Sequence, residues 1–156
     1  MARERFYYGI NTNSLGEMAL SDIATLAVNA GAQGIEWGLP SLDKAAAACR
    51  EMQKVTVDAG LQVIGYLNAG HLWKTDLIRR WSDVIAPAGG KVLRVSPPWA
   101  AWNLEESVHQ QSSYPDMVKK TREGLENLVP LGKEYGIRYV IETHSGGVSA
   151  SIPLAR

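Results

Sequence analysis

The chain has 156 residues, of which 46% are apolar and 21% charged, a composition ordinary for a single globular domain. Basic and acidic residues balance at 16 each, so no basic surface is indicated and nucleic acid is a disfavoured partner. Cys49 is the only cysteine, which excludes an internal disulfide and a thiolate zinc cluster. The sequence shows no signal-peptide core and no membrane-spanning apolar run, so we expect a cytoplasmic protein without a membrane partner.

A short motif recurs along the chain, in which Ala-Gly or Tyr-Gly precedes a β-rich run. An earlier run at residues 7–11 supplies a first strand. Glycine just past a helix takes the left-handed conformation that closes it, so each motif marks a helix end followed by a strand. The motifs are Ala30-Gly31 before residues 34–37, Ala59-Gly60 before 62–66, Ala88-Gly89 before 91–95, and Tyr135-Gly136 before 138–142.

The segments between these runs carry apolar residues at helical spacing, for example Ile78, Trp81 and Ile85. Pro130 falls inside the last such segment and is expected to kink or restart that helix. Strict strand–helix alternation implies parallel strands with helical crossovers. We therefore predict an α/β fold, a partial (β/α)8 TIM barrel of about five βα units forming one incomplete domain over residues 1–156. An open flavodoxin-like sheet is the structural competitor.

Three charged residues interrupt these apolar strands near their carboxyl ends: Glu36, Arg94 and Glu142. A buried charge is costly unless it is paired or coordinates a ligand, and the carboxyl ends of barrel strands carry the active site. Alternate side chains of a strand share a face, which also places Asn11 as a pocket candidate in the first strand. The alternative is that Arg94 simply neutralises Glu142 across the sheet.

Aromatic and amide side chains cluster in the same regions. Tryptophan faces beside carboxylates and amides suit a polyol, which has C–H faces and hydroxyl edges. Alternatively, the tryptophans cover apolar surface beneath long loops. Besides Asn11 and Arg94, the substrate-binding candidates are Trp37, Tyr66, Asn68, His71, Trp73 and Trp99.

Three segments carry a family resemblance: Gly-Ile-Glu-Trp-Gly at 34–38, Gly-Leu-Gln-Val-Ile-Gly at 60–65, and Glu-Tyr-Gly-Ile-Arg-Tyr-Val-Ile-Glu-Thr-His-Ser-Gly at 134–146. With them the chain resembles the xylose isomerase-like superfamily of sugar phosphate isomerases and epimerases. The resemblance implies that Glu142 binds a divalent metal and that His144 contacts substrate or metal-bound water. It makes Glu142, His144 and Glu36 the catalytic candidates. In the related endonuclease IV-like branch a histidine at the place of His71, just after the third strand, binds zinc.

The chemistry that the resemblance implies is proton transfer next to a carbonyl of a sugar or polyol. A divalent ion (Mn, Mg, Co or Zn) stabilises the enediolate, and a carboxylate relays the proton. A complete barrel has eight strands and about 250 residues. We therefore expect the chain alone to have an incomplete metal site, to be inactive, and to expose two sheet edges.

Two other functions remain open from the sequence. One is a non-catalytic fragment or sugar-binding remnant that completes its sheet by self-association, giving a homo-oligomer. The other is an endonuclease IV-like DNA repair enzyme, which the zero net charge and the three histidines disfavour.

Overall fold

The computed structural model describes residues 8–67, 69–97 and 114–142. Five strands form one parallel sheet in the order β1-β2-β3-β4-β5, which is also their order along the chain. A doubly wound sheet reverses its strand order at a switch point, whereas a barrel adds each strand beside the last. The predicted partial barrel is therefore confirmed over the flavodoxin-like competitor. The strands are β1 (Gly9–Asn11), β2 (Gly34–Gly38), β3 (Gln62–Leu67), β4 (Val92–Val95) and β5 (Arg138–Ile141).

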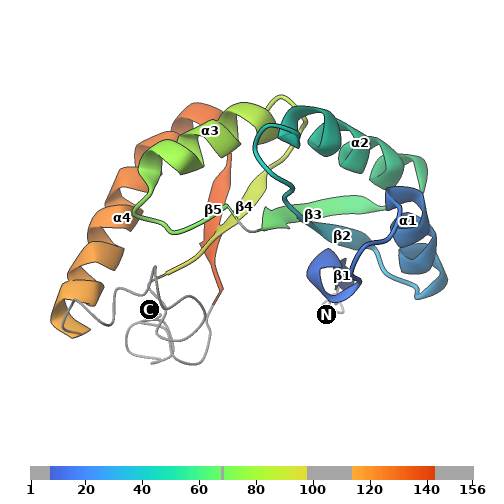
Figure 1. Cartoon of the computed structure of the whole chain (residues 1–156), viewed down its shortest axis with the longest axis horizontal. Coiled ribbons are helices and arrows are strands. Elements are labelled where there is room, and N and C mark those ends of the chain that lie inside the picture. The colour runs from blue at the N-terminus through green and yellow to red at the C-terminus, as the bar shows by residue number, and fades with distance from the viewer. Residues whose placement is uncertain (1–7, 68, 98–113, 143–156) are drawn as a thin grey trace, which may run out of the picture.

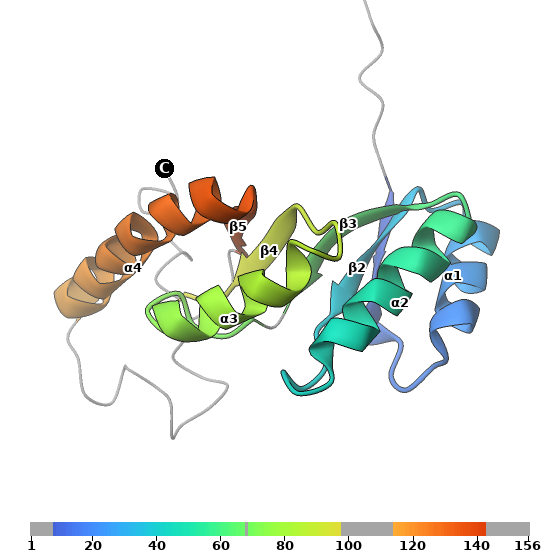
Figure 2. The same cartoon turned by 90° about the horizontal axis from the view of Figure 1, so that it is seen from above.

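Four helices follow the first four strands and lie on one side of the sheet. Figure 1 shows them as an arc above the strands, and the view from above in Figure 2 shows the same layer. Right-handed crossovers place every connecting helix of such a progression on one face. The other face of the sheet is concave and carries no described helix. The helices are α1 (Leu20–Asn29), α2 (Ala45–Asp58), α3 (Thr75–Ile85) and α4 (Tyr114–Tyr135), and a short 3-10 helix, η1 (Thr12–Ser14), follows β1.

The hydrophobic core lies between this helix layer and the sheet. Period-two alternation sends every second strand residue toward the helices, where apolar side chains are removed from water. Fully buried side chains from the strands include Ile35, Trp37, Tyr66 and Leu93, and those from the helices include Ala27, Cys49, Ile78 and Ile85.

The helix ends follow the predicted motif. Gly31, Gly60 and Gly136 stand just past the ends of α1, α2 and α4 and have positive φ, between 64° and 74°, as left-handed helix-closing residues do. Gly89 also has positive φ, at 83°, but it lies in a turn four residues beyond the end of α3. The prediction for Pro130 is not met as a restart, since α4 runs as one helix from Tyr114 to Tyr135 with Pro130 inside it. Pro130 is exposed, so water can satisfy the carbonyl group that the proline leaves without its helical donor.

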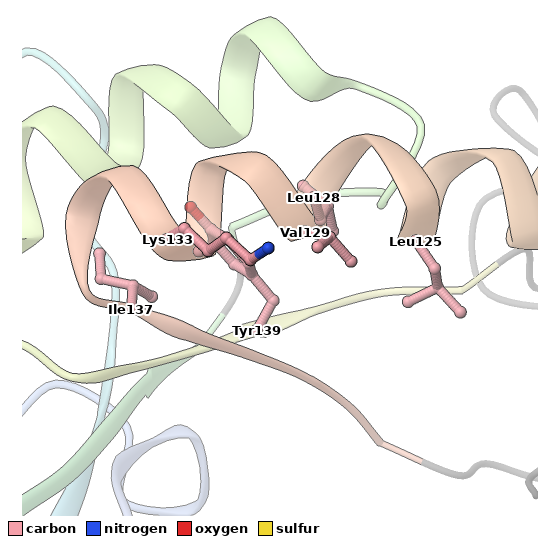
Figure 3. Close-up of a pocket in the computed structure, with 7 residues that line it drawn as sticks. Leu125, Leu128, Val129, Lys133, Ile137 and Tyr139 are labelled. Atoms are coloured by element: carbon pink, nitrogen blue, oxygen red, sulfur yellow. The ribbon is translucent and has the colours of Figure 1, made fainter.

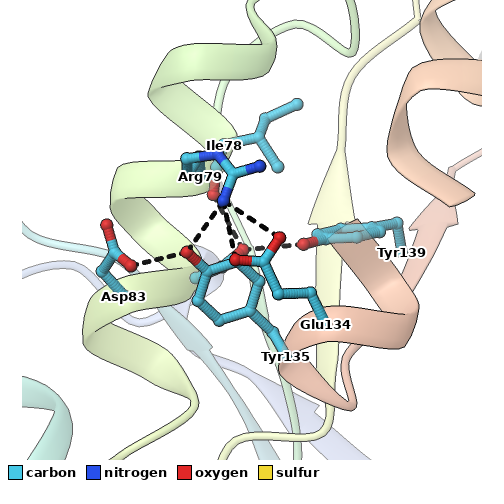
Figure 4. A network of polar contacts seen from close by, with 7 residues as sticks. Ile78, Arg79, Asp83, Glu134, Tyr135 and Tyr139 are labelled. Carbon is cyan, nitrogen blue, oxygen red and sulfur yellow. Dashed lines mark hydrogen bonds and ion pairs between the residues drawn. The ribbon is translucent and has the colours of Figure 1, made fainter. Parts of the chain in front are cut away.

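Helices α3 and α4 are joined by a polar network on the outer surface, drawn in Figure 4. Arg79 Nη1 donates to both carboxylate oxygens of Glu134, at 2.8 and 3.0 Å, and Tyr135 Oη donates to Asp83 Oδ1 at 2.6 Å. The hydrogen bond to Asp83 raises the pKa of Tyr135. Because these groups are exposed, water and salt screen the network, and it orients the two helices more than it stabilises them. No described helix is long and apolar enough to cross a membrane.

One buried hydrogen bond ties the sheet to the helix layer. Trp37 Nε1 in β2 donates to Thr56 Oγ1 in α2 at 2.9 Å, and Thr56 Oγ1 donates to the Met52 carbonyl oxygen at 2.6 Å. Trp37 is 1% exposed and Thr56 is fully buried. Replacing the hydroxyl would leave a buried indole N–H without its acceptor.

We predict that Thr56→Val lowers the free energy of unfolding by about 1–3 kcal/mol, the usual cost of an unsatisfied buried donor. Urea denaturation followed by tryptophan fluorescence measures this value. Thr25→Val is the matched control, because Thr25 makes the same helical hydrogen bond, to the Ser21 carbonyl oxygen, at an exposed position. Equal losses in the two variants would contradict the role assigned to the Trp37 contact.

Candidate functional site

Polar side chains from several strands face the concave side of the sheet. Asn11 ends β1 and is the register partner of Glu36 in β2. Arg94 in β4 lies between Leu93 and Val95, which are both buried. Because neighbouring residues of a strand face opposite sides, Arg94 points away from the helix layer, with 17% of its side chain exposed.

Glu142 reaches the same region from β5. It directly follows the strand and stands two residues beyond Val140, the register partner of Arg94. The two-residue spacing puts Val140 and Glu142 on the same face, and the Glu142 side chain is 45% exposed. The carboxylate therefore lies at the rim of the concave face.

Four side chains form a continuous row of contacts across the sheet, from β1 to the end of β5. Asn11 Nδ2 donates to Glu36 Oε2 at 2.9 Å. Arg94 Nε lies 3.9 Å from Glu36 Oε1, and Arg94 Nη1 lies 2.8 Å from Glu142 Oε2. We call Asn11, Glu36, Arg94 and Glu142 the polar cluster. It holds two carboxylates and one guanidinium, so its charge is net negative.

Strand β3, which lies between β2 and β4, leaves room for this row of contacting side chains. Gly65 in β3 is the register partner of Glu36, and the register shifts between Ile35 and Glu36, which makes a β-bulge. A side chain at Gly65 would begin 3.1 Å from the Val92 side chain. Without one, Arg94 and Glu36 on either side of β3 can meet.

The motif at residues 60–65 contains Gly65, but the sequence analysis predicted no role for this residue. A glycine inside an apolar strand was the signal, because such a glycine marks a close approach. The sequence analysis also did not predict a role for Thr12, whose Oγ1 accepts a hydrogen bond from the Gly38 backbone N–H at 2.8 Å. That bond links η1 to the carboxyl end of β2, beside the polar cluster.

Two predicted pocket residues lie on the wrong face. Trp37 donates to Thr56 in α2, and the Tyr66 hydroxyl donates to the Cys49 carbonyl oxygen, also in α2, at 3.4 Å. Both side chains are buried beneath the helix layer. The prediction that Trp37 and Tyr66 wall a substrate pocket is therefore wrong, because strand alternation turns them away from Glu36.

His71 and Trp73 lie together after β3, in the connection that leads to α3. Their rings stack with centroids 4.3 Å apart and planes 8° from parallel. His71 also forms an isolated parallel bridge with Ser96, just beyond β4. These contacts place the pair at the carboxyl side of the sheet, and their substrate-binding roles stay predictions. Asn68, Trp99 and His144 lie outside the described residues.

The donor set of the described residues does not fit a divalent ion by itself. In the parts of the chain that the structure describes, no group of three or more His, Cys, Asp or Glu side chains could hold a metal. The two carboxylates of the polar cluster both contact Arg94, whereas a metal site needs three or more protein ligands or ligands shared with substrate. The role of Glu142 as a metal ligand stays a prediction.

Comparison with solved structures finds the same fold in parts of three proteins. The 3-keto-D-glucoside 4-epimerase YcjR from E. coli matches 92% of this chain with a TM-score of 0.70 and 15% identity. The IolI protein with a bound zinc atom matches 96% with a TM-score of 0.71 and 12% identity. A sugar phosphate isomerase/epimerase from Parabacteroides distasonis matches 93% with a TM-score of 0.67 and 17% identity. No family model and no curated protein matches the sequence.

The chain spans little more than half of each of these structures: 58%, 56% and 54% of their respective lengths. Similarity at such low identity establishes the fold alone. The chain therefore has the fold of about half of a xylose isomerase-like TIM barrel, and the predicted resemblance is confirmed at that level.

The buried thiol lies apart from the polar cluster. Cys49 belongs to α2 and is fully buried under the helix layer. Burial, which disfavours the thiolate and outweighs the nearby positive charge of Arg50, raises the pKa of Cys49 from 9.0 to about 11. A protonated, buried thiol is a poor nucleophile.

We predict that iodoacetamide at pH 8.5 modifies Cys49 at least about a hundredfold more slowly in the folded chain than in urea, because the folded chain shields the fully buried sulfur from the reagent and burial also raises the thiol pKa. Mass spectrometry of timed samples measures the rates. Because the thiol keeps its proton more readily in the folded state, its raised pKa contributes to the free energy of unfolding. This contribution is complete below pH 9 and is lost as the pH rises from 9 toward 11. Similar rates in the two states would show that the thiol is accessible.

Proposed function

We propose that the chain provides the sugar-binding part of a barrel of the isomerase/epimerase type, acting on a sugar or polyol. The observation that carries this proposal is the polar cluster, in which side chains from β1, β2, β4 and the end of β5 meet on the concave face. Ligands of barrel enzymes bind at the carboxyl ends of the strands. The similarity to an epimerase and to a sugar phosphate isomerase/epimerase supports the substrate class.

Each member of the polar cluster has a proposed part in binding. The Glu36 carboxylate and the Asn11 amide would accept and donate hydrogen bonds to neighbouring hydroxyls. Arg94 already contacts two carboxylates, so it suits a hydroxyl oxygen better than a second anion. A net negative cluster repels phosphate, which favours an uncharged sugar or polyol at this position.

The chemical step would depend on Glu142 and on groups beyond the described residues. Glu142 and His144 are proposed to serve proton transfer next to the carbonyl, with Glu36 holding the substrate. In a completed barrel Glu142 remains the proposed ligand of a divalent ion such as Mn, Mg, Co or Zn, with the other ligands supplied from elsewhere. The chain alone would bind substrate weakly and turn it over little.

We predict that millimolar uncharged ketoses or inositols shift the amide NMR signals of residues 11, 36 and 94 in the chain. Glu36→Gln should weaken this binding about tenfold, because a hydrogen bond to a charged group contributes about 1.5–3 kcal/mol. Glu134→Gln is the matched control, since this exposed glutamate also pairs with an arginine but lies on the outer surface.

If no sugar in the panel moves these signals, or if the two glutamine variants bind equally, the sugar-binding proposal fails. Deuterium uptake from D2O at the carbon beside the carbonyl provides the catalytic readout. It should be absent or very slow in the chain alone. Where a completed barrel shows uptake, Glu142→Gln should abolish it.

A separate observation favours the alternative function, in which the chain is a non-catalytic fragment or sugar-binding remnant that associates with a second copy. A groove of about 370 Å³ runs between α4 and β5, lined by Leu125, Leu128, Val129, Gly132, Lys133, Ile137 and Tyr139 (Figure 3). Among the described strands, β5 is an edge of the sheet, and Val129 is 57% exposed. Apolar surface beside an unpaired strand edge promotes association with a second copy. The DNA-repair alternative is not tested by these observations.

We predict that, if a second copy fills this groove, Val129→Glu shifts the chain toward monomer at least tenfold in dissociation constant, because a carboxylate would be desolvated at the contact. Sedimentation velocity over a concentration series measures the change. Val57→Glu in α2 is the matched control, with a wild-type exposure of 56%. A parent chain that stays monomeric at all concentrations would contradict self-association.

A further inference from the structure

The side-chain amide of Asn11 is held in one orientation by two contacts of opposite kinds. Its Oδ1 accepts a hydrogen bond from the Asn13 backbone N–H at 2.9 Å, which makes Asn11 the N-cap of η1. Its Nδ2 donates to Glu36 Oε2, also at 2.9 Å. A backbone N–H can only donate and an ionised carboxylate can only accept. Turning the amide over would therefore break both hydrogen bonds.

The segment that carries Asn11 is itself tied to the carboxyl end of β2. Asn11 is the register partner of Glu36. The next residue, Thr12, accepts a hydrogen bond at Oγ1 from the backbone N–H of Gly38, which stands two residues after Glu36 in the same strand. The Asn11 amide therefore reaches Glu36 from a backbone position that is fixed against β2.

The two carboxylate oxygens of Glu36 have different surroundings. Oε2 accepts the hydrogen bond from Asn11 Nδ2. Oε1 lies 3.9 Å from Arg94 Nε, which is too far for a hydrogen bond. Among the described residues no hydrogen bond reaches Oε1, and the Glu36 side chain is 23% exposed. Oε1 is therefore the oxygen that can accept a hydrogen bond from a ligand on the concave face.

We propose that Asn11 is a positioning residue for Glu36: its amide holds Oε2 and thereby presents Oε1 to a hydroxyl group of the bound sugar or polyol. A carboxylate that is already held in place loses less conformational freedom when the ligand binds. The hydroxyl then donates a charge-assisted hydrogen bond to Oε1. This inference rests on the proposed function and deepens it, because it assigns the ligand contact to one oxygen and its orientation to Asn11.

The first arm of the test contains no sugar and follows the Asn11 side-chain NH2 signals by 1H–15N NMR. Glu36→Gln should shift these signals by more than their line width, because a neutral amide accepts a weaker hydrogen bond than a carboxylate does. Glu134→Gln, on the outer surface, should leave them in place. This arm leaves Asn11 itself unchanged. Unmoved Asn11 signals in Glu36→Gln would overturn the proposal, whether or not the chain binds a sugar.

The second arm measures the binding of millimolar myo-inositol and D-fructose through the amide NMR signals of residues 36 and 94. Asn11→Asp keeps the acceptor for the Asn13 N–H but replaces the donor to Glu36 with a like charge, so the dissociation constant should rise at least about tenfold. Asn29→Asp adds the same charge at an exposed position in α1 and should stay within about twofold of the parent. Circular dichroism checks that each variant is folded.

The double variant Asn11→Asp with Glu36→Gln separates positioning from local structure. It exchanges donor and acceptor and keeps the net charge, so the two side chains can remake their contact. The urea midpoint should return toward that of the parent, whereas sugar binding should stay about tenfold weaker, because the carboxylate at position 36 is gone. A purely structural role would restore both, and recovery of both would refute the proposal.

The outcomes also separate this inference from the function on which it rests. If the parent binds neither ligand, the sugar-binding proposal fails and the role of Glu36 Oε1 fails with it. If the parent binds a ligand and Asn11→Asp binds it equally well, only the positioning role of Asn11 is wrong.

Discussion

Burial of a carboxylate or guanidinium without a partner, under a layer of helices, costs several kcal/mol of folding free energy. This cost determines which strand residues face the helices and which face away from them. All four crossover helices lie on one face of the sheet, so each strand must send its apolar residues to that face. Its remaining residues then face the concave side. Ile35 and Trp37 are buried under the helices, whereas Glu36 between them is partly exposed. The polar cluster follows from this sorting combined with the parallel register.

The ion pairs in the polar cluster are weak evidence for stability. A pair taken partly out of water loses much of its attraction to desolvation, and the 3.9 Å contact between Arg94 and Glu36 is long. The two carboxylates come from β2 and from the residue that directly follows β5. The outer network around Arg79, which joins α3 to α4, shows what a mainly structural set of charges looks like in the same chain.

The regular βα repeat could be read from the chain because each of its signals is local. Glycines at helix ends, apolar periodicity and the two-residue alternation of strands depend on near neighbours, and the glycines adopt positive φ where expected. The same alternation already put Glu36 and Trp37 on opposite faces. Grouping Trp37 and Tyr66 with the pocket nevertheless ignored that rule in favour of residue chemistry. Their polar edges instead meet Thr56 and the Cys49 carbonyl group inside the helix layer.

The sequence by itself determined the order of strands and helices and the face on which each charged residue lies, because both depend on contacts within a few residues. Only the tertiary structure decided that Asn11, Glu36, Arg94 and Glu142 touch. Those contacts join residues 25 to 58 positions apart in the sequence, and they depend on strand register, on the bulge in β3 and on the space above Gly65. The tertiary structure also decided that Arg94 contacts both glutamates. Its side chain reaches Glu36 across β3, and no sequence spacing encodes that distance.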